Sequence, residues 1–191
     1  MITYSSSLYP SLCSLIKHSY WQQRENRENA VHGNAPREYS IIGINGGRRA
    51  GHSTSIVMAS LSFFAQPLII LPNMSMLRQM YRLFCGYLED RKIQFRRLEN
   101  NIIELPTIYD IGSFDSALVR SFTFDTLGQG AINCFRRVRI KHDALFVDNC
   151  QFVEDSHRLS KEQIYQEYRN AIMAFRSDLP NSHINFGIFL Q

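Results

Sequence analysis

The sequence has few cysteines, no long apolar run and no repeated or low-complexity segment. Its cysteines form no C-x-x-C pair, so we expect no zinc site and reduced thiols; they are Cys13, Cys85, Cys134 and Cys150. No stretch is apolar enough over a sufficient length to predict a membrane-spanning helix. The first residues lack the basic region of a signal peptide. These absences favour a cytosolic globular protein with no membrane partner.

Lysine is also scarce, with four residues against 17 arginines in a chain of net charge +4. Arginine favours two-pronged contacts with phosphate and carboxylate, although the bias can also reflect genome composition. The mild basicity permits nucleic-acid binding without requiring it. A length of 191 residues and 45% hydrophobic content fit one domain with a full core. We expect a helical segment and linker over 1–37 and one domain over 38–191.

Residues 38–59 have the pattern of a buried strand, a glycine-rich turn and the start of a helix. The turn runs G-x-x-x-x-G-H-S-T, close to the phosphate-binding pattern G-x-x-x-x-G-K-[ST]. Glycines let backbone N–H groups converge on phosphate oxygens, and the helix adds its positive N-terminal end. Ser53 or Thr54 would offer a hydroxyl to Mg²⁺. The predicted nucleotide-binding residues are Gly46, Gly47, Arg48, Arg49, Ala50, Gly51, His52, Ser53 and Thr54.

The lysine of this pattern is replaced by His52. Lysine normally reaches the β- and γ-phosphates as a compact cation, whereas histidine is shorter and mostly neutral near pH 7. Arg48 and Arg49 lie within the turn and are the alternative source of positive charge. The competing interpretation is a glycine-rich turn that binds nothing, but the complete strand–turn–helix context favours a polyphosphate site.

A second motif is the run Asp143–Asp148, in which four apolar residues precede an acid. A carboxylate at the carboxyl end of a central strand, beside a phosphate loop, holds Mg²⁺ directly or through water. We therefore predict Asp148 and Ser53 as the metal-binding residues, with an ordinary strand-end acid as the alternative. Asn149 occupies the catalytic position where many hydrolysing relatives carry glutamate. An amide orients water but cannot accept its proton.

The remaining chain alternates predicted helices with short apolar strands, which indicates an α/β three-layer sandwich with a mainly parallel central sheet, of the P-loop NTPase type. Because Asp148 must reach the metal, strands 39–44 and 144–148 should be adjacent or separated by one strand. Helices are expected over 8–28, 53–64, 75–88 and 160–175, and a short one over Asp115–Phe122; further strands are expected over 68–71, 92–98, 101–105 and 184–190, and within 131–140.

Arg137, Arg139 and Lys141 fall on one face of that last predicted strand, at a period of two. This basic row is either a solvated edge that blocks aggregation or a surface that contacts the phosphates of a nucleic acid. The solvated edge is the preferred interpretation.

In this order, the motifs resemble those of the ATPase domain of the large terminase subunit of tailed bacteriophages, a DNA-packaging motor. Gly46–Ser53 is similar to that family's G-G-R-x-x-G-K-[ST], and Asp143–Asp148 is similar to the D-x4-D before its D-E pair. The strand at 68–71, the strand pair around Asn100 and the strand at 184–190 lie where the family has its later motifs. The resemblance covers about residues 38–191.

The resemblance implies a viral protein that uses ATP and Mg²⁺, engages DNA and acts with a protein partner or as a homo-oligomer. It implies a location in the host cytoplasm or at the virion during assembly. His52 and Asn149 depart from the family at two catalytic positions, and no room remains for a following nuclease domain. We therefore expect an isolated motor fragment or a small degenerate relative, and the joint departures favour the relative.

Two functions compete on this evidence. One is an ATP–Mg²⁺-binding protein of the packaging-ATPase type with weak or absent hydrolysis. The other is a non-enzymatic protein with a vestigial loop, acting through nucleic acid or a protein partner. A small phosphotransferase is disfavoured, because no lid-like arginine cluster or second-substrate motif is evident.

Overall fold

The computed structural model describes residues 6–29, 40–46, 50–99, 101–106, 120–126, 142–157, 159–175 and 186–191. Helices and strands alternate over most of this length, as in a layered α/β protein. In chain order the elements are α1 (Tyr9–Asn29), β1 (Ile41–Ile44), α2 (His52–Phe63), β2 (Pro67–Leu71), α3 (Met74–Asp90), β3 (Arg96–Leu98), β4 (Ile102–Leu105), β5 (Arg120–Thr126), β6 (Ala144–Val147), α5 (Cys150–His157), α6 (Lys161–Phe175) and β7 (Phe186–Leu190).

The seven strands form one mixed sheet in the order β1-β7-β6-β2-β5-β4-β3. The five strands from β1 to β5 in this order are parallel, while β4 and β3 continue the sheet as an antiparallel hairpin. All residues of β2, β6 and β7 are buried, which explains why these strands are continuous apolar runs without alternation.

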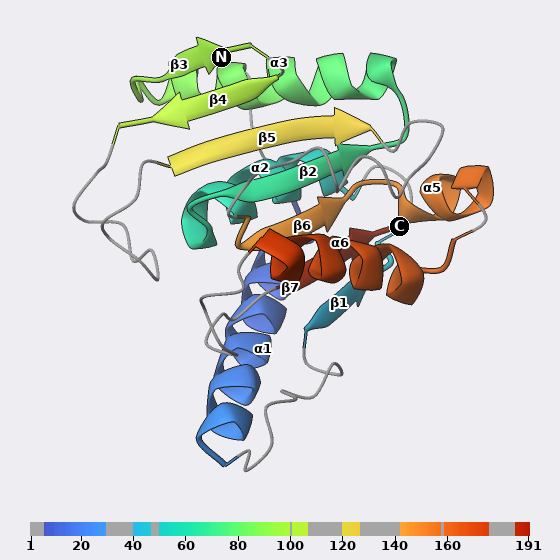
Figure 1. Cartoon of the computed structure of the whole chain (residues 1–191). Coiled ribbons are helices and arrows are strands. Elements are labelled where there is room, and N and C mark those ends of the chain that lie inside the picture. Colours follow the sequence, from blue (N-terminus) through green and yellow to red (C-terminus); the bar gives the residue numbers. More distant parts are fainter. Residues whose placement is uncertain are drawn as a thin grey trace.

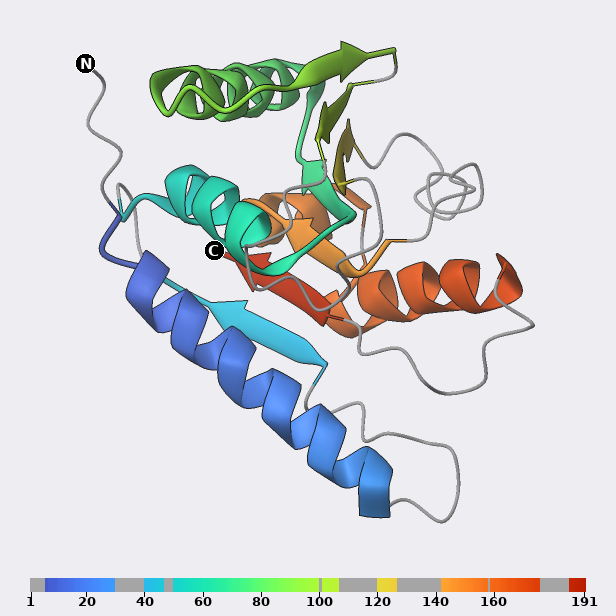
Figure 2. The same cartoon turned by 90° about the vertical axis from the view of Figure 1, so that its left-hand side faces the viewer.

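Helices cover both faces of the sheet, so the protein has three layers (Figures 1 and 2). On one face α1, α2 and α3 bury side chains such as Leu12, Ile56 and Phe84 against the sheet. On the other face α5 and α6 do the same with Val153 and Ile164. The two buried clusters occupy opposite faces because successive strand residues point to opposite sides. The predicted α/β class with a mainly parallel sheet is confirmed.

Two helix starts show how local sequence sets the element boundaries. The Asn73 side chain accepts a hydrogen bond from the Met76 N–H at 3.0 Å, so Asn73, and not Ser75, caps α3. Ser160 and Gln163 exchange side chain-to-backbone hydrogen bonds at the start of α6. This reciprocal pair is a capping box at the start of the helix that was expected over 160–175.

The predicted position of the two motif strands is confirmed. β7 lies between β1 and β6, with Ile42 opposite Ile188 and Phe146 opposite the same residue. The predicted hairpin is also present as β3 and β4, although β3 is shorter than expected. The residue at its turn, Asn101, has φ 58°, a left-handed conformation that asparagine tolerates.

The short helix expected over Asp115–Phe122 is wrong where the structure describes it. Residues from Arg120 onward belong to strand β5, which pairs with β2 and β4, and residues 115–119 lie outside the described ranges. Phe122 and Phe124 alternate with polar residues, a period of two that signalled a strand. Their rings pack on Phe84 of α3, and this long-range contact decides the strand. The strand expected within 131–140 lies outside the described residues.

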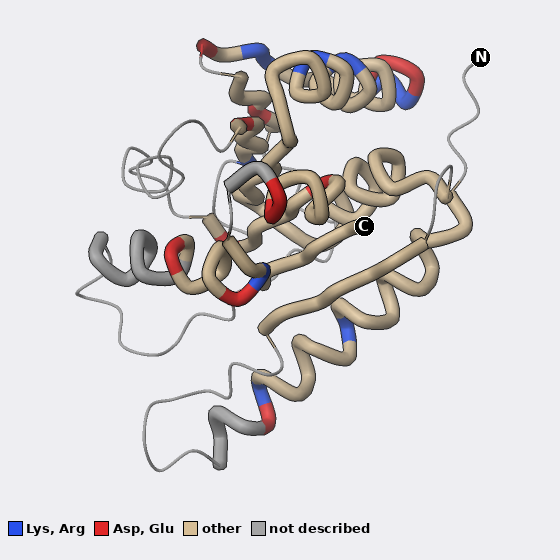
Figure 3. The backbone as a smooth tube through the Cα atoms, turned by 90° about the vertical axis from the view of Figure 1, so that its right-hand side faces the viewer, with Lys and Arg blue, Asp and Glu red and all other residues tan. Residues whose placement is uncertain are grey.

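Most of the described charged residues lie on the helices and on the β3–β4 hairpin (Figure 3), whereas Arg120 and Asp148 are buried. At the amino end of β6, Asp143 accepts N–H bonds from Ala65 and Gln66 at 2.6 and 3.1 Å. Burial raises the pKa of Asp143 to about 6, and Arg120 is among the groups that lower it. Asp143 therefore ties β6 to the turn before β2, at the opposite end of β6 from Asp148. None of the described helices combines the length and apolarity needed to cross a membrane.

Candidate functional site

The glycine-rich turn joins the carboxyl end of β1 to the start of α2. Gly51 is the N-cap residue of α2 with φ 82°, a left-handed conformation that favours glycine, and no side chain caps this helix. The cap residue offers no side chain to the first-turn N–H groups, which lie at the positive end of the helix dipole, where an anion is favoured. Gly46, Ala50, His52 and Thr54 lie along this connection as predicted, whereas Gly47, Arg48 and Arg49 lie outside the described residues.

The segment before α1 packs directly on this turn. The Ser6 hydroxyl donates to the Ala50 carbonyl at 3.2 Å and also shares a short hydrogen bond with the Ser55 hydroxyl. A Cβ at Gly51 would lie 2.9 Å from Ser6, and one at Gly46 would lie 2.5 Å from the Leu8 side chain. The two glycines are therefore also required by packing, a role that their spacing alone does not reveal.

Asp148 lies at the carboxyl end of β6 and is only 4% exposed. Its N–H donates to the Ile70 carbonyl at 3.1 Å, which fixes the residue beside β2. Its Oδ2 accepts a hydrogen bond from the Ser53 hydroxyl at 3.0 Å. The two residues predicted as metal ligands, 95 positions apart in the chain, thus lie in direct contact.

The surroundings of the Asp148 carboxyl shift its pKa in opposite directions. Burial raises its pKa, while the Ser53 hydrogen bond and the charge of His52 lower it. The Nε2 atom of His52 is buried and has no hydrogen-bond partner among the described residues. A buried carboxylate is stabilised by a cation or metal, and Ser53 and Asp148 supply the oxygen ligands that Mg²⁺ prefers.

Asn149 follows Asp148 and is exposed, with φ 50°. Its carbonyl accepts N–H bonds from Phe152 and Val153 at 3.1 and 3.4 Å, so the residue also begins α5. Asparagine tolerates this left-handed backbone better than most residues. Asn149 therefore has a conformational role beside the predicted catalytic one.

Two residues near this site were missed from the sequence. Gln191 lies just after β7, and its main chain bonds both Ile44 and Gly46. Lys161, the first residue of α6, donates a hydrogen bond to the Gln191 side chain. A polar residue directly after a buried strand, as at Asp148, was the available signal for Gln191. No pattern in the sequence indicated that Lys161 lies near the site.

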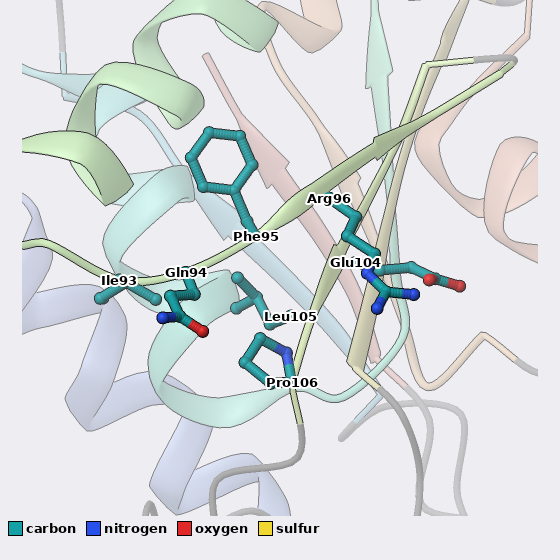
Figure 4. A pocket seen from close by; sticks show the side chains of 7 residues that line it. All are labelled: Ile93, Gln94, Phe95, Arg96, Glu104, Leu105 and Pro106. Carbon is teal, nitrogen blue, oxygen red and sulfur yellow. The ribbon is translucent and has the colours of Figure 1, made fainter.

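The predicted basic row of Arg137, Arg139 and Lys141 lies outside the described residues, so the structure does not decide between a solvated edge and its alternative, a surface that contacts nucleic acid. A cavity of about 700 Å³ opens elsewhere, at the hairpin end of the sheet (Figure 4). Strand order places β3 and β4 at the opposite edge from β1, so this cavity is separate from the phosphate-loop site. It is lined by Ile93, Gln94, Phe95, Arg96, Glu104, Leu105 and Pro106.

No protein-family model matches the chain, and no curated protein matches its sequence. Among solved structures, the large terminase of a thermophilic bacteriophage matches with a TM-score of 0.50 and 11% identity, over 79% of this chain and 33% of that one. The large terminase ATPase domain of Thermus phage P74-26 matches at 0.45 and 12%, over 79% and 58%. The Phi-28 gp11 DNA packaging motor matches at 0.37 and 13%, over 80% and 46%.

The likeness to the first of these, the thermophilic bacteriophage terminase, shows the fold: a layered α/β protein with a mostly parallel sheet. The chain spans about a third of the length of that terminase. At this identity the likeness carries no residue roles, so the roles of the site residues depend on the geometry given above.

Proposed function

We propose that this chain is a viral ATP–Mg²⁺-binding protein of the packaging-ATPase type, with weak or absent hydrolysis. One observation carries the proposal: the hydrogen bond from Ser53 to Asp148 at 3.0 Å. It unites the hydroxyl of the glycine-rich turn with the strand-end acid of a separate motif. Both motifs are needed for metal-assisted nucleotide binding, and their direct contact is the arrangement that such a site requires.

In this proposal Ser53 and Asp148 hold Mg²⁺, and the first-turn N–H groups of α2 bind phosphate. Bound Mg²⁺ would neutralise charge on the β- and γ-phosphate oxygens. The buried position of Asp148 excludes water and strengthens its attraction for a cation. Asn149 orients a water molecule without accepting its proton, which supports nucleotide binding with slow turnover.

Nucleotide-dependent thermal stabilisation tests the proposal. ATP with Mg²⁺ at 100 times its Kd adds roughly 2.7 kcal/mol to the free energy of unfolding. For a chain of this size that corresponds to a rise in Tm of about 5 to 10 °C. We expect this rise with ATP and Mg²⁺ together, and a smaller one with ATP and EDTA.

AMP with Mg²⁺ is the matched ligand control, because it lacks the phosphates that the metal bridges. An unchanged Tm with every nucleotide would contradict ATP binding. The chain would then be a non-catalytic interaction protein with a vestigial site, acting through nucleic acid or a protein partner.

A further prediction concerns the charge that replaces the loop lysine. We expect Arg48 or Arg49 to supply it, Arg48 foremost, because arginine keeps its proton throughout the physiological range. Affinity for ATP should then be nearly constant between about pH 6 and 8 and should fall in Arg48→Ala or Arg49→Ala. If His52 supplied the charge, affinity would weaken as pH rises, since an ordinary histidine loses its proton near about pH 6.5.

Titrations of ATP at three pH values, with wild type and both alanine variants, separate these outcomes. Unchanged binding in both variants, together with a clear pH dependence, would assign the charge to His52 instead.

The partners that fit this proposal are DNA and further copies of the chain or another motor protein. Arg137, Arg139 and Lys141 are the proposed DNA contacts, and the proposed location is the host cytoplasm or the virion during assembly. Loss of DNA binding in a triple Arg137→Ala, Arg139→Ala and Lys141→Ala variant would support this assignment.

A further inference from the structure

Gln191 connects the glycine-rich turn to the rest of the sheet edge. Its N–H donates to the Ile44 carbonyl at 2.9 Å, and its carbonyl accepts from the Gly46 N–H at 3.2 Å. Strand β7, which it follows, lies between β1 and β6. Gln191 is therefore held at the carboxyl edge of the sheet, between the turn that follows β1 and Asp148 at the end of β6.

The side chain of Gln191 contacts both helices of the opposite layer. Its amide nitrogen donates to Gln151 Oε1 of α5 at 2.8 Å. Its amide oxygen accepts from Lys161 Nζ of α6 at 3.4 Å. In Figure 1 the C-terminus accordingly lies beside α5 and α6. The Lys161 ammonium group thus contacts Gln191, whose main chain is hydrogen-bonded to Gly46, the first glycine of the turn.

The charge of Lys161 also reaches the start of α5. Burial raises the pKa of the Cys150 thiol, and the charge of Lys161 is the largest influence that lowers it. Cys150 comes two residues after Asp148. The ammonium group therefore lies beside Gln191 and close enough to the start of α5 to influence Cys150.

The local structure does not stabilise the positive charge of Lys161. It occupies the first position of α6, where the helix dipole disfavours positive charge. Within the described ranges no ion pair joins it to a carboxylate, and its contact with Gln191 is a long hydrogen bond to a neutral amide. For the neighbouring Glu162, the charge of Lys161 is the smallest of the influences on the pKa. Its charge is thus largely unmatched.

We propose that Lys161 is a specificity-determining residue that supplies a cation to the terminal phosphate of ATP, from outside the glycine-rich turn. This inference depends on the proposed nucleotide site. The charge of Lys161 adds to the one that Arg48 or Arg49 supplies within the turn, and it gives the site a preference for nucleoside triphosphates over diphosphates. Gln191 orients the ammonium group and couples it to Gly46.

The test compares Lys161→Gln with wild type by isothermal titration of ATP and of ADP, each with Mg²⁺ at fixed ionic strength. A hydrogen bond to a charged group supports an expected loss of about tenfold or more in ATP affinity. ADP affinity should change by less than about threefold, so the preference for ATP over ADP falls. Lys161→Arg should retain most of that preference, because it keeps the charge.

Lys17→Gln is the matched control, because it removes one positive charge from the exposed surface of α1. It should leave both affinities unchanged. Equal losses for ATP and ADP in Lys161→Gln would overturn the inference in favour of a packing role through Gln191, and unchanged ATP affinity would overturn it outright. If wild type binds neither nucleotide, the proposed function fails as well, whereas the first two outcomes leave ATP binding intact.

Discussion

Replacing Asp148 with asparagine should abolish most of the Mg²⁺-dependent part of ATP binding while leaving the fold intact. Even residues that only support a metal ligand change metal affinity by roughly 10- to 100-fold, so loss of a direct ligand should cost at least that much. Asparagine keeps the volume and an oxygen that accepts the Ser53 hydrogen bond. The measurement is ATP affinity with Mg²⁺ and with EDTA, for wild type and Asp148→Asn.

The stability of the ligand-free variant provides a second readout. Because burial raises the pKa of Asp148, its ionised form is less favoured in the folded protein than in the unfolded chain. Removing the charge should therefore leave the Tm unchanged or raise it. Asp90→Asn on the exposed end of α3 is the control for losing one negative charge. Equal Mg²⁺ dependence in wild type and Asp148→Asn would remove this residue from the metal site.

A double variant that carries lysine in place of His52 and glutamate in place of Asn149 should raise ATP turnover by about tenfold or more over a slow wild type. His52→Lys returns a cation to the turn, and Asn149→Glu returns a group that accepts a proton from water. Loss of transition-state charge stabilisation typically costs on the order of a hundredfold or more in rate, so the double variant should exceed either single one. Phosphate release at saturating ATP and Mg²⁺ measures the effect.

The backbone at Asn149 limits this gain. Its φ of 50° is a conformation that costs most residues about 1–2 kcal/mol, so Asn149→Glu should lower stability by about 1 kcal/mol. Adding Asp148→Asn to the double variant is the control, and it should return turnover to background. Rapid turnover by wild type that disappears in Asp148→Ala would show that His52 and Asn149 do not impair catalysis.

The two competing functions differ in what the Ser53–Asp148 contact is for. In an interaction protein the contact would only join α2 to β6, and a metal would add nothing. Ser6 and Leu8 pack on Ala50, Gly51 and Gly46, so the turn also has a structural role that does not depend on a nucleotide. The Mg²⁺ dependence of binding, rather than the presence of the turn, therefore separates the two functions.

Local patterns in the sequence determined much of the fold. The apolar runs at Leu68–Leu71 and Ala144–Val147 were recognisable because strands buried on both faces have no polar alternation. A helix start such as that at Ser160 is set locally, because side chain-to-backbone capping acts within a few residues. The pairing of Ser53 with Asp148 was also expected, since carboxyl ends of neighbouring parallel strands share one edge of the sheet.

The tertiary structure alone decided the features that depend on distant partners. The alternation in β5 indicates a strand, but its residues do not specify its pairing with β2 and β4 or the packing of Phe122 and Phe124 on α3. The insertion of β7 between β1 and β6 places Gln191 and Lys161 beside the turn. Parallel strands pair across long stretches of chain, so periodicity reveals that a strand exists but not which strand lies beside it.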